Sequence, residues 1–214
     1  MLFNLATKHS IANRFIAELR NTEIQQDRLR FRRNLERLGE VMAYEISKTL
    51  EYSEAAVETP LGTALPMLPT QRIVLATILR AGLPLHQGML NYFDTADNVF
   101  IAAFRKHHKD GSFEIQLDYV STPNLDGCVL ILADPMLATG ASVNIALKEL
   151  ERFGKPAAIH LATVIASTAG VEAVRRRWPN LRIWAGAVDE ELTAKSYIVP
   201  GLGDAGDLAF GEKL

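Results

Sequence analysis

The segment Val129-Leu-Ile-Leu-Ala-Asp-Pro-Met-Leu-Ala-Thr-Gly-Ala-Ser142 decides the fold. It opens with an apolar run, which is typical of a strand buried on both faces. The polar residues and the glycine after Ala133 predict a turn, and a helical pattern starts near Ser142. A buried strand, a turn and a helix in this order form the repeating unit of a parallel α/β sheet.

The same alternation runs through most of the chain. Apolar runs predict strands at residues 72–79, 98–104, 127–133, 157–166 and 181–188. Helical patterns occupy residues 83–93, 142–153 and 169–178, and residues 112–120 alternate like one strand of a hairpin or flap. We therefore expect an α/β fold with a parallel sheet flanked by helices, whose ligands bind beyond the carboxyl ends of the strands.

The N-terminal part has a helical pattern. Residues 22–50 carry an apolar stripe at helical spacing, and Thr22 with Gln25 predicts a capping box at the start of one long helix. Arginines at helical spacing within it indicate a solvated or subunit-contacting face: Arg28, Arg30, Arg32, Arg33 and Arg37. The prolines and the glycine of residues 57–70 exclude a long helix there.

The composition is that of an ordinary globular protein. The chain has 214 residues, is 48% hydrophobic and carries a net charge of -2, so nothing indicates a nucleic-acid binder. Its one cysteine, Cys128, excludes an internal disulfide, and its apolar surroundings indicate a buried small residue. The N-terminus lacks a signal-peptide pattern, and no apolar run reaches the ~20 residues of a membrane span. We expect a cytoplasmic protein without nucleic-acid or membrane partners.

The turn after the decisive strand has the residues of a phosphate site. Thr139, Gly140 and Ser142 lie where a helix begins, and free backbone N–H groups and the helix dipole favour an anion there. The two hydroxyl groups add donors, and the glycine lets the backbone approach the anion. Asp134 comes shortly before and could accept hydrogen bonds from sugar hydroxyls, so the turn suits a ribose 5-phosphate. A capped helix with an unrelated acid is the alternative.

Two arginines follow other predicted strands. Arg80 ends one of them, and its guanidinium could bind two oxygens of a diphosphate, with a surface ion pair as the alternative. Arg105 ends another and begins a polar loop, residues 105–111, with the composition of a lid. His107 and His108 could be read as metal ligands, but adjacent loop residues seldom point at one ion, so we expect no metal site there.

These segments resemble the uracil branch of the type I phosphoribosyltransferases. The resemblance covers nearly the whole chain and rests mainly on Ile78-Leu-Arg-Ala-Gly-Leu83, Asp134-Pro-Met-Leu-Ala-Thr-Gly140 and Tyr197-Ile-Val-Pro-Gly-Leu-Gly-Asp-Ala-Gly-Asp207. One departure is Ala141, where the family usually has a second glycine. Its methyl group is tolerated if φ at this residue is negative.

The last of these segments contains a literal Gly-x-Gly-x-x-Gly pattern. Only residues 208–214 follow it, too few for the further strand and helix of a dinucleotide site. Its main-chain groups can instead match the alternating acceptors and donor along the edge of uracil, and unpaired groups would then penalise other bases.

The resemblance implies an enzyme that transfers ribose 5-phosphate from phosphoribosyl pyrophosphate (PRPP) to uracil, giving UMP and pyrophosphate, as in pyrimidine salvage. It implies catalytic contacts from Arg80, Arg105, Asp134 and Asp204. PRPP contacts are implied for these four and for Pro135, Met136, Leu137, Ala138, Thr139, Gly140, Ala141 and Ser142. Uracil contacts are implied for Ile198, Gly203, Asp204 and Ala205, with Asp207 supporting the loop.

The resemblance also implies a cofactor, a domain plan and an assembly. Mg²⁺ would be carried by PRPP without protein ligands, and GTP is a candidate allosteric activator. One domain would span residues 1–214, with a helical arm over about 1–52, a core over about 70–190, and a uracil-binding hood from about 57–70 and 190–214. A homodimer or larger homo-oligomer is expected. A transferase for another base, or a non-catalytic PRPP-binding regulator of pyrimidine metabolism, stays open.

Overall fold

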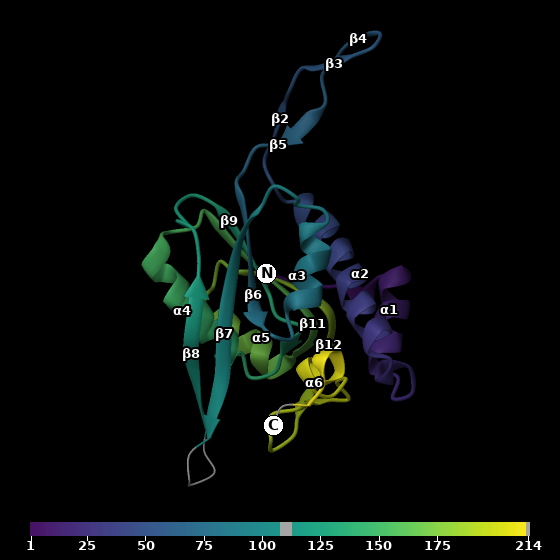
Figure 1. Cartoon of the computed structure of the whole chain (residues 1–214), viewed down its shortest axis with the longest axis vertical. Helices are drawn as coiled ribbons and strands as arrows, with labels where there is room; N and C mark the ends of the chain where they lie inside the picture. Colours follow the sequence, from purple (N-terminus) through teal and green to yellow (C-terminus); the bar gives the residue numbers. More distant parts are fainter. Residues whose placement is uncertain (108–112, 213–214) are drawn as a thin grey trace.

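The protein, described here by a computed structural model, folds around a mostly parallel sheet (Figure 1). The structure describes residues 1–107 and 113–212, with side chains at residues 1–102 and 118–212. Within that part of the chain the sheet has eight strands in the order β1-β12-β11-β9-β6-β7-β8, with β10 paired to β11. Their bounds are β1 Leu2–Asn4, β6 Ile73–Leu79, β7 Asp97–His107, β8 Phe113–Ser121, β9 Val129–Ala133, β10 Met136–Leu137, β11 Ala158–Ser167 and β12 Arg182–Asp189.

The predicted fold class is confirmed, because neighbouring strands are parallel except in the hairpin of β7 and β8. Helices cover both faces of the sheet. On one face lie α1 Ile11–Arg20, α2 Arg28–Ser47, α3 Leu83–Leu90 and α6 Ala205–Phe210, and on the other lie α4 Ala141–Leu150 and α5 Thr168–Arg177. Short 3₁₀ turns occupy η1 Leu5–Thr7, η2 Ile24–Gln26 and η3 Glu151–Phe153.

Successive residues of the central strands point into two different cores. Leu75 of β6 and Ile131 of β9 pack with α2 and α3. Val74 and Leu130, one position earlier, pack with α4 and α5 on the other face. This double burial explains why the strands are apolar throughout instead of alternating.

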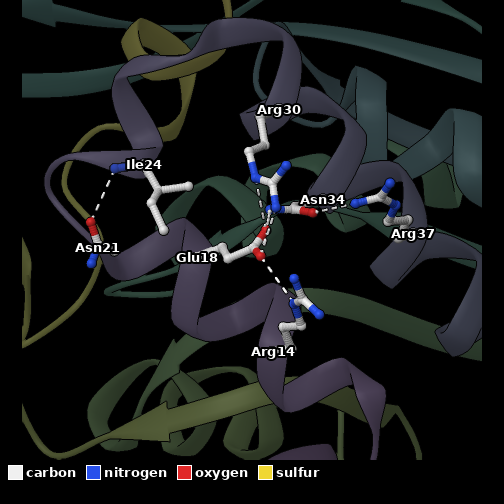
Figure 2. A network of polar contacts seen from close by, with 7 residues as sticks. All are labelled: Arg14, Glu18, Asn21, Ile24, Arg30, Asn34 and Arg37. Carbon is white, nitrogen blue, oxygen red and sulfur yellow. Dashed lines mark hydrogen bonds and ion pairs between the residues drawn. The ribbon is translucent and has the colours of Figure 1, made fainter.

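The predicted long helix over residues 22–50 begins later than expected. The side chain of Asp27 accepts hydrogen bonds from the backbone N–H groups of residues 29 and 30, and α2 therefore starts at Arg28. The capping box at Thr22 is wrong, because Asn21 accepts from the N–H groups of residues 23 and 24 and closes a separate 3₁₀ turn (Figure 2). Ile24 is exposed and lies outside the apolar stripe.

A buried carboxylate joins α1 to α2. Glu18 accepts hydrogen bonds from Arg30 and Asn34 of α2 at 2.8 Å each, and from Arg14 of α1 at 3.2 Å (Figure 2). The Arg30 hydrogen bond, with that of Asn34, lowers the pKa of Glu18 to about 2. The predicted solvated face of arginines is therefore wrong in part: Arg30 pairs within the chain, and Arg32 donates to the carbonyl oxygen of residue 209.

Residues 52–69 form an exposed arm made of two small antiparallel pairs (Figure 1). The strands are β2 Tyr52–Glu54 paired with β5 Met67–Pro69, and β3 Val57–Thr59 paired with β4 Gly62–Ala64. In Figure 1 this arm and α6 lie at opposite ends of the longest axis, so residues 57–70 do not form a hood together with residues 190–214 of the same chain. In the described part of the chain, none of the helices combines the length and the apolar character needed to cross a bilayer.

Candidate active site at the carboxyl ends of the strands

The loops after β6 and β9 lie side by side at one edge of the sheet. The two strands pair in register as far as Thr77 and Ala133, so Arg80 and Asp134 leave the sheet at the same end. Gly82 packs between them: a Cβ at this position would lie 2.2 Å from Thr77 Oγ1 and 2.8 Å from the carbonyl oxygen of Ala133. The close approach of these two predicted PRPP loops therefore depends on a glycine.

Asp134 is a buried carboxylate without a strong partner among the residues whose side chains the structure describes. Its side chain is 9% exposed, and it accepts one long hydrogen bond, 3.5 Å, from the backbone N–H of Met136. Burial raises the pKa of Asp134 to about 7, and the hydrogen bond from Met136 opposes this only weakly. Such a group gains free energy when a ligand brings hydroxyl donors to it, because they stabilise its ionised form.

The predicted phosphate turn has the expected shape. Gly140 adopts φ 76°, a left-handed conformation that favours glycine, and α4 begins at the next residue without a side-chain cap at its N-cap position. Thr139 is exposed and its hydroxyl accepts from the N–H of Ala141 at 3.3 Å. Ala141 and Ser142 lie in the first turn of α4, so the backbone at Ala141 is helical and carries its methyl group without strain.

The strand β10 and helix α5 support this turn from below. Met136 and Leu137 pair with β11, and the hydroxyl of Ser167 donates to the carbonyl oxygen of Ala138. At Gly170 of α5, an added Cβ would lie 2.4 Å from the same carbonyl oxygen. Sequence reasoning missed both supporting residues, although Ser167 directly follows the predicted strand 157–166.

The C-terminal segment combines a buried strand residue with an exposed turn. Ile198 is 5% exposed and pairs with Leu192 in the short ladder of β13 Glu191–Leu192 and β14 Ile198–Val199. Gly203 and Asp204 are exposed, and Ala205 is buried at the start of α6. Asp204 Oδ1 accepts from the N–H groups of residues 206 and 207, which caps this helix.

Arg80 joins the C-terminal segment to the loop after β6. Its guanidinium donates to Asp207 Oδ1 at 2.9 Å and to the carbonyl oxygen of Gly211. An added Cβ at Gly206 would lie 3.8 Å from the methyl group of Ala81. The ion-pair alternative for Arg80 is thus realised with Asp207, and the segments predicted for PRPP and for uracil are in contact.

Arg105 lies where β7 extends beyond the end of β6. Pairing of β7 with β6 ends at Ala102, and the backbone of Arg105 pairs with Ile115 of β8. The side chain of Arg105 lies outside the described residues, as do loop residues 108–112 of the predicted lid. Its contact with PRPP stays a prediction.

A cavity of about 670 Å³ opens between the start of α2 and the C-terminal segment. Gln25, Arg28 and Leu29 line one side, and Gly203, Asp204 and Leu208 line the other. Asp134 and residues 135–142 are not among the residues that line this cavity, and the phosphate contact at the Asp134 turn stays a prediction.

Comparison with known proteins agrees with this geometry. The family profile of uracil phosphoribosyltransferase matches residues 6–212. A uracil phosphoribosyltransferase of Porphyromonas gingivalis is 52% identical over 214 residues, covering 100% of this chain and 99% of the relative. One of Methanothermobacter thermautotrophicus is 43% identical over 183 residues, covering 85% and 83%.

Solved structures show the same architecture. The structure of a protein from Aquifex aeolicus superposes with a TM-score of 0.88 at 30% identity, covering 99% of this chain and 98% of that one. Since the family profile spans nearly every residue and includes all three loops that meet at this edge of the sheet, the chain belongs to the uracil phosphoribosyltransferase family.

Proposed function

We propose that the protein transfers the ribose 5-phosphate group of PRPP to N1 of uracil, releasing pyrophosphate and forming UMP. The observation that carries this proposal is the meeting of three loops, after β6, after β9 and at residues 198–207, at one edge of the sheet. Ligands of parallel α/β sheets bind at this edge. Family membership supports the choice of uracil as the base.

The Asp134 turn would hold the sugar phosphate. In the proposal the start of α4, residues 139–142, donates backbone and hydroxyl hydrogen bonds to the 5-phosphate. Pro135 to Ala138, between Asp134 and the start of α4, would contact the same ligand. Asp134 accepts from the ribose hydroxyls, and its raised pKa falls as these donors arrive.

Charge stabilisation during bond breaking would come from cations around the diphosphate. As C1 of the ribose separates from pyrophosphate, negative charge develops on the leaving group, and in the proposal Arg80, directly after β6, and Arg105, on the neighbouring strand β7, neutralise it. Arg80 would exchange its bond to Asp207 for the diphosphate. No covalent intermediate is needed, because the loops position both reactants and stabilise the charge.

Uracil would lie against the C-terminal segment. Main-chain groups at Ile198 and at residues 203–205 can match the acceptor, donor and acceptor of the pyrimidine edge. Asp204 Oδ1 is committed to capping α6, so Oδ2 remains for a substrate contact. Ala205, buried at the start of α6, would give the ring an apolar neighbour.

The residues present fit a metal carried by the substrate. The described residues contain no group of three or more metal-ligating side chains, and near the turn the carboxylates of Asp134 and Asp204 come from separate loops. We propose that diphosphate oxygens and water hold Mg²⁺. When bound, Mg²⁺ supplies charge neutralisation on the leaving group. GTP activation stays a prediction, tested by adding GTP to the same assay.

We also propose self-association through the arm of residues 52–69. The arm exposes apolar side chains that the rest of the same chain does not cover, among them Leu61, Leu65 and Met67. Exposed apolar surface of this kind is typical of protein contacts. Light scattering on the purified chain measures the assembly, and a monomer at micromolar concentration would contradict the proposal.

One assay tests the proposed function against both alternatives. The protein is incubated with PRPP, Mg²⁺ and each of uracil, cytosine, hypoxanthine and orotate, and pyrophosphate release is measured. We expect release with uracil alone. Release with another base favours a different specificity, and PRPP binding without turnover favours a regulatory protein.

A further inference from the structure

An ion pair that the sequence did not single out lies behind the C-terminal segment. Arg20 is the last residue of α1 and Asp189 is the last residue of β12. Two parallel hydrogen bonds join them, Nη1 to Oδ2 at 2.7 Å and Nη2 to Oδ1 at 2.8 Å. Burial would raise the pKa of Asp189, but hydrogen bonds from Arg20 and from the N–H of Gly201 hold it below the usual value.

The ion pair binds both the N–H and the carbonyl oxygen of Gly201. The N–H of Gly201 donates to Asp189 Oδ2 at 2.9 Å, and its carbonyl oxygen accepts from Arg20 Nη1 at 2.9 Å. Gly201 is buried with φ 56°, and an added Cβ would lie 2.2 Å from the carbonyl oxygen of Ile198. The ion pair therefore fixes the backbone direction at one residue of a turn that only glycine can form.

A neighbouring amide holds the next residue. With its amide nitrogen turned inward, Gln25 donates to the carbonyl oxygen of Leu19 at 3.0 Å and to that of Leu202 at 2.9 Å. The peptides of residues 201 and 202 are thus tied to the end of α1 and to the turn after it. They lie directly between Ile198 and Gly203, the two positions that flank the proposed base site.

We propose that Arg20 and Asp189 are positioning residues that set the placement of the base-binding segment and thereby the affinity for uracil. The inference rests on the proposed function, in which residues 198–205 contact uracil through main-chain groups. Such groups cannot adjust by changing rotamer, so their alignment depends on what holds the peptide chain. A misplacement of about 1 Å costs roughly 100-fold in rate at sites of this kind.

Elements outside the substrate loops hold the Arg20–Asp189 ion pair in place. Glu18, two residues before Arg20, is held by Arg30 and Asn34 of α2 (Figure 2), which fixes the end of α1 against the second helix. Asp189 is held by its place at the carboxyl end of β12. The sheet and the N-terminal helices thus reach the turn from two sides, whereas the phosphate turn depends on α4 and α5.

The test separates affinity for uracil from affinity for PRPP. Arg20→Lys keeps the charge but offers a single ammonium group, which cannot bind both carboxylate oxygens and the Gly201 carbonyl oxygen in the geometry of a guanidinium. We expect KM for uracil to rise about 10-fold or more, with KM for PRPP changed less than about threefold. Arg14→Lys, on the same helix and paired with Glu18, is the matched control and should leave both constants unchanged.

Hydrogen exchange on the full chain distinguishes a local change in the C-terminal segment from a general loss of stability. Amides of residues 202–204 should exchange faster in Arg20→Lys than in the wild type, while those of β6 and β9 should not. A second variant, Gln25→Met, leaves the ion pair intact and removes the bond to Leu202. It should also raise KM for uracil, by a smaller factor than Arg20→Lys does. It tests the positioning role if the ion-pair variants do not fold.

The outcomes distinguish this inference from the proposed function. If the wild type makes no UMP from uracil and PRPP, the proposed function is wrong. If the wild type is active and Arg20→Lys raises both KM values equally, or only lowers Tm, the positioning role is overturned. Unchanged constants in a folded Gln25→Met variant would overturn it as well.

Discussion

Replacing Asp134 by asparagine should make the unliganded protein more stable and much less active. The carboxylate is buried, and its pKa is raised to about 7 by desolvation. Among side chains 1–102 and 118–212 it has no paired cation, and it accepts one long hydrogen bond from the backbone of Met136. The substitution Asp134→Asn keeps the shape of the side chain and removes only the charge. The two effects have opposite signs because the charge is useful only when sugar hydroxyls are present.

The stability change follows from the pKa. The pKa of the carboxyl rises from 3.8 to about 7 on folding. At about 1.4 kcal/mol per pKa unit, ionised Asp134 destabilises the folded state by roughly 4 kcal/mol at pH 8. Burying an amide costs roughly 2 kcal/mol of that gain. The net increase in the free energy of unfolding is about 2 kcal/mol, or a Tm higher by about 4–8 °C.

The stability gained through Asp134→Asn should depend on pH. The folded state holds the proton more tightly than the unfolded state, so ionised Asp134 increasingly destabilises the wild type as pH rises from about 4 to about 7. The gain in Tm from Asp134→Asn should therefore be largest above pH 7. It should shrink steadily as the pH is lowered towards 4.

Thermal unfolding at several pH values and steady-state kinetics measure both effects. Asp94→Asn, at an exposed position, is the control and should change Tm by less than about 1 °C. We expect kcat/KM for PRPP to fall at least about 100-fold in Asp134→Asn. A lower Tm at pH 8, or near-normal kcat/KM, would refute the view of Asp134 as a strained acceptor waiting for the ribose.

Three further variants test separate parts of the structure. Glu18→Gln should lower the free energy of unfolding in urea by about 2 kcal/mol at pH 7, because hydrogen bonds from Arg30 and Asn34 hold the pKa of Glu18 near 2. This stabilisation is present above pH 4.5 and fades as the pH falls towards 2. Equal stability of the two proteins at pH 7 would contradict it. Gly170→Ala places a methyl group 2.4 Å from the carbonyl oxygen of Ala138, so KM for PRPP should rise while KM for uracil changes little. Arg80→Ala should lower kcat/KM for PRPP by about 100-fold, and an effect on Tm alone would return Arg80 to a structural role.

The positions of the central strands could be predicted from the sequence, because a strand buried on both faces is an uninterrupted apolar run. The predicted run 127–133 contains β9, which begins at Val129, and the run 157–166 corresponds to β11, which is shifted by one residue to Ala158–Ser167. The start of the second helix was not predictable in the same way. Thr22, Asn21 and Asp27 are all acceptable caps in the sequence, and in the structure Asp27 caps α2.

Candidate site residues can be proposed from the sequence where a polar side chain directly follows a predicted strand. Arg80 and Asp134 were proposed by this rule, and the same rule applied to every strand would also have selected Asp189 and Ser167. The position of Arg20 could not be found this way, since it lies 169 residues from its partner and has no motif around it. Contacts of that separation are visible only after the chain has folded.

Three arginines from other parts of the chain hold the C-terminal segment through its carbonyl oxygens. From Gly201 to Gly211 the chain offers few side chains that can anchor it, so the rest of the protein must hold its carbonyl oxygens. Arg20 donates to Gly201, Arg32 donates to Ala209 and Arg80 donates to Gly211. Guanidinium groups suit this task because their donors are fixed in one plane. The segment proposed to bind uracil through its main chain is thereby held by side chains from three other elements, together with its own Asp207, which pairs with Arg80.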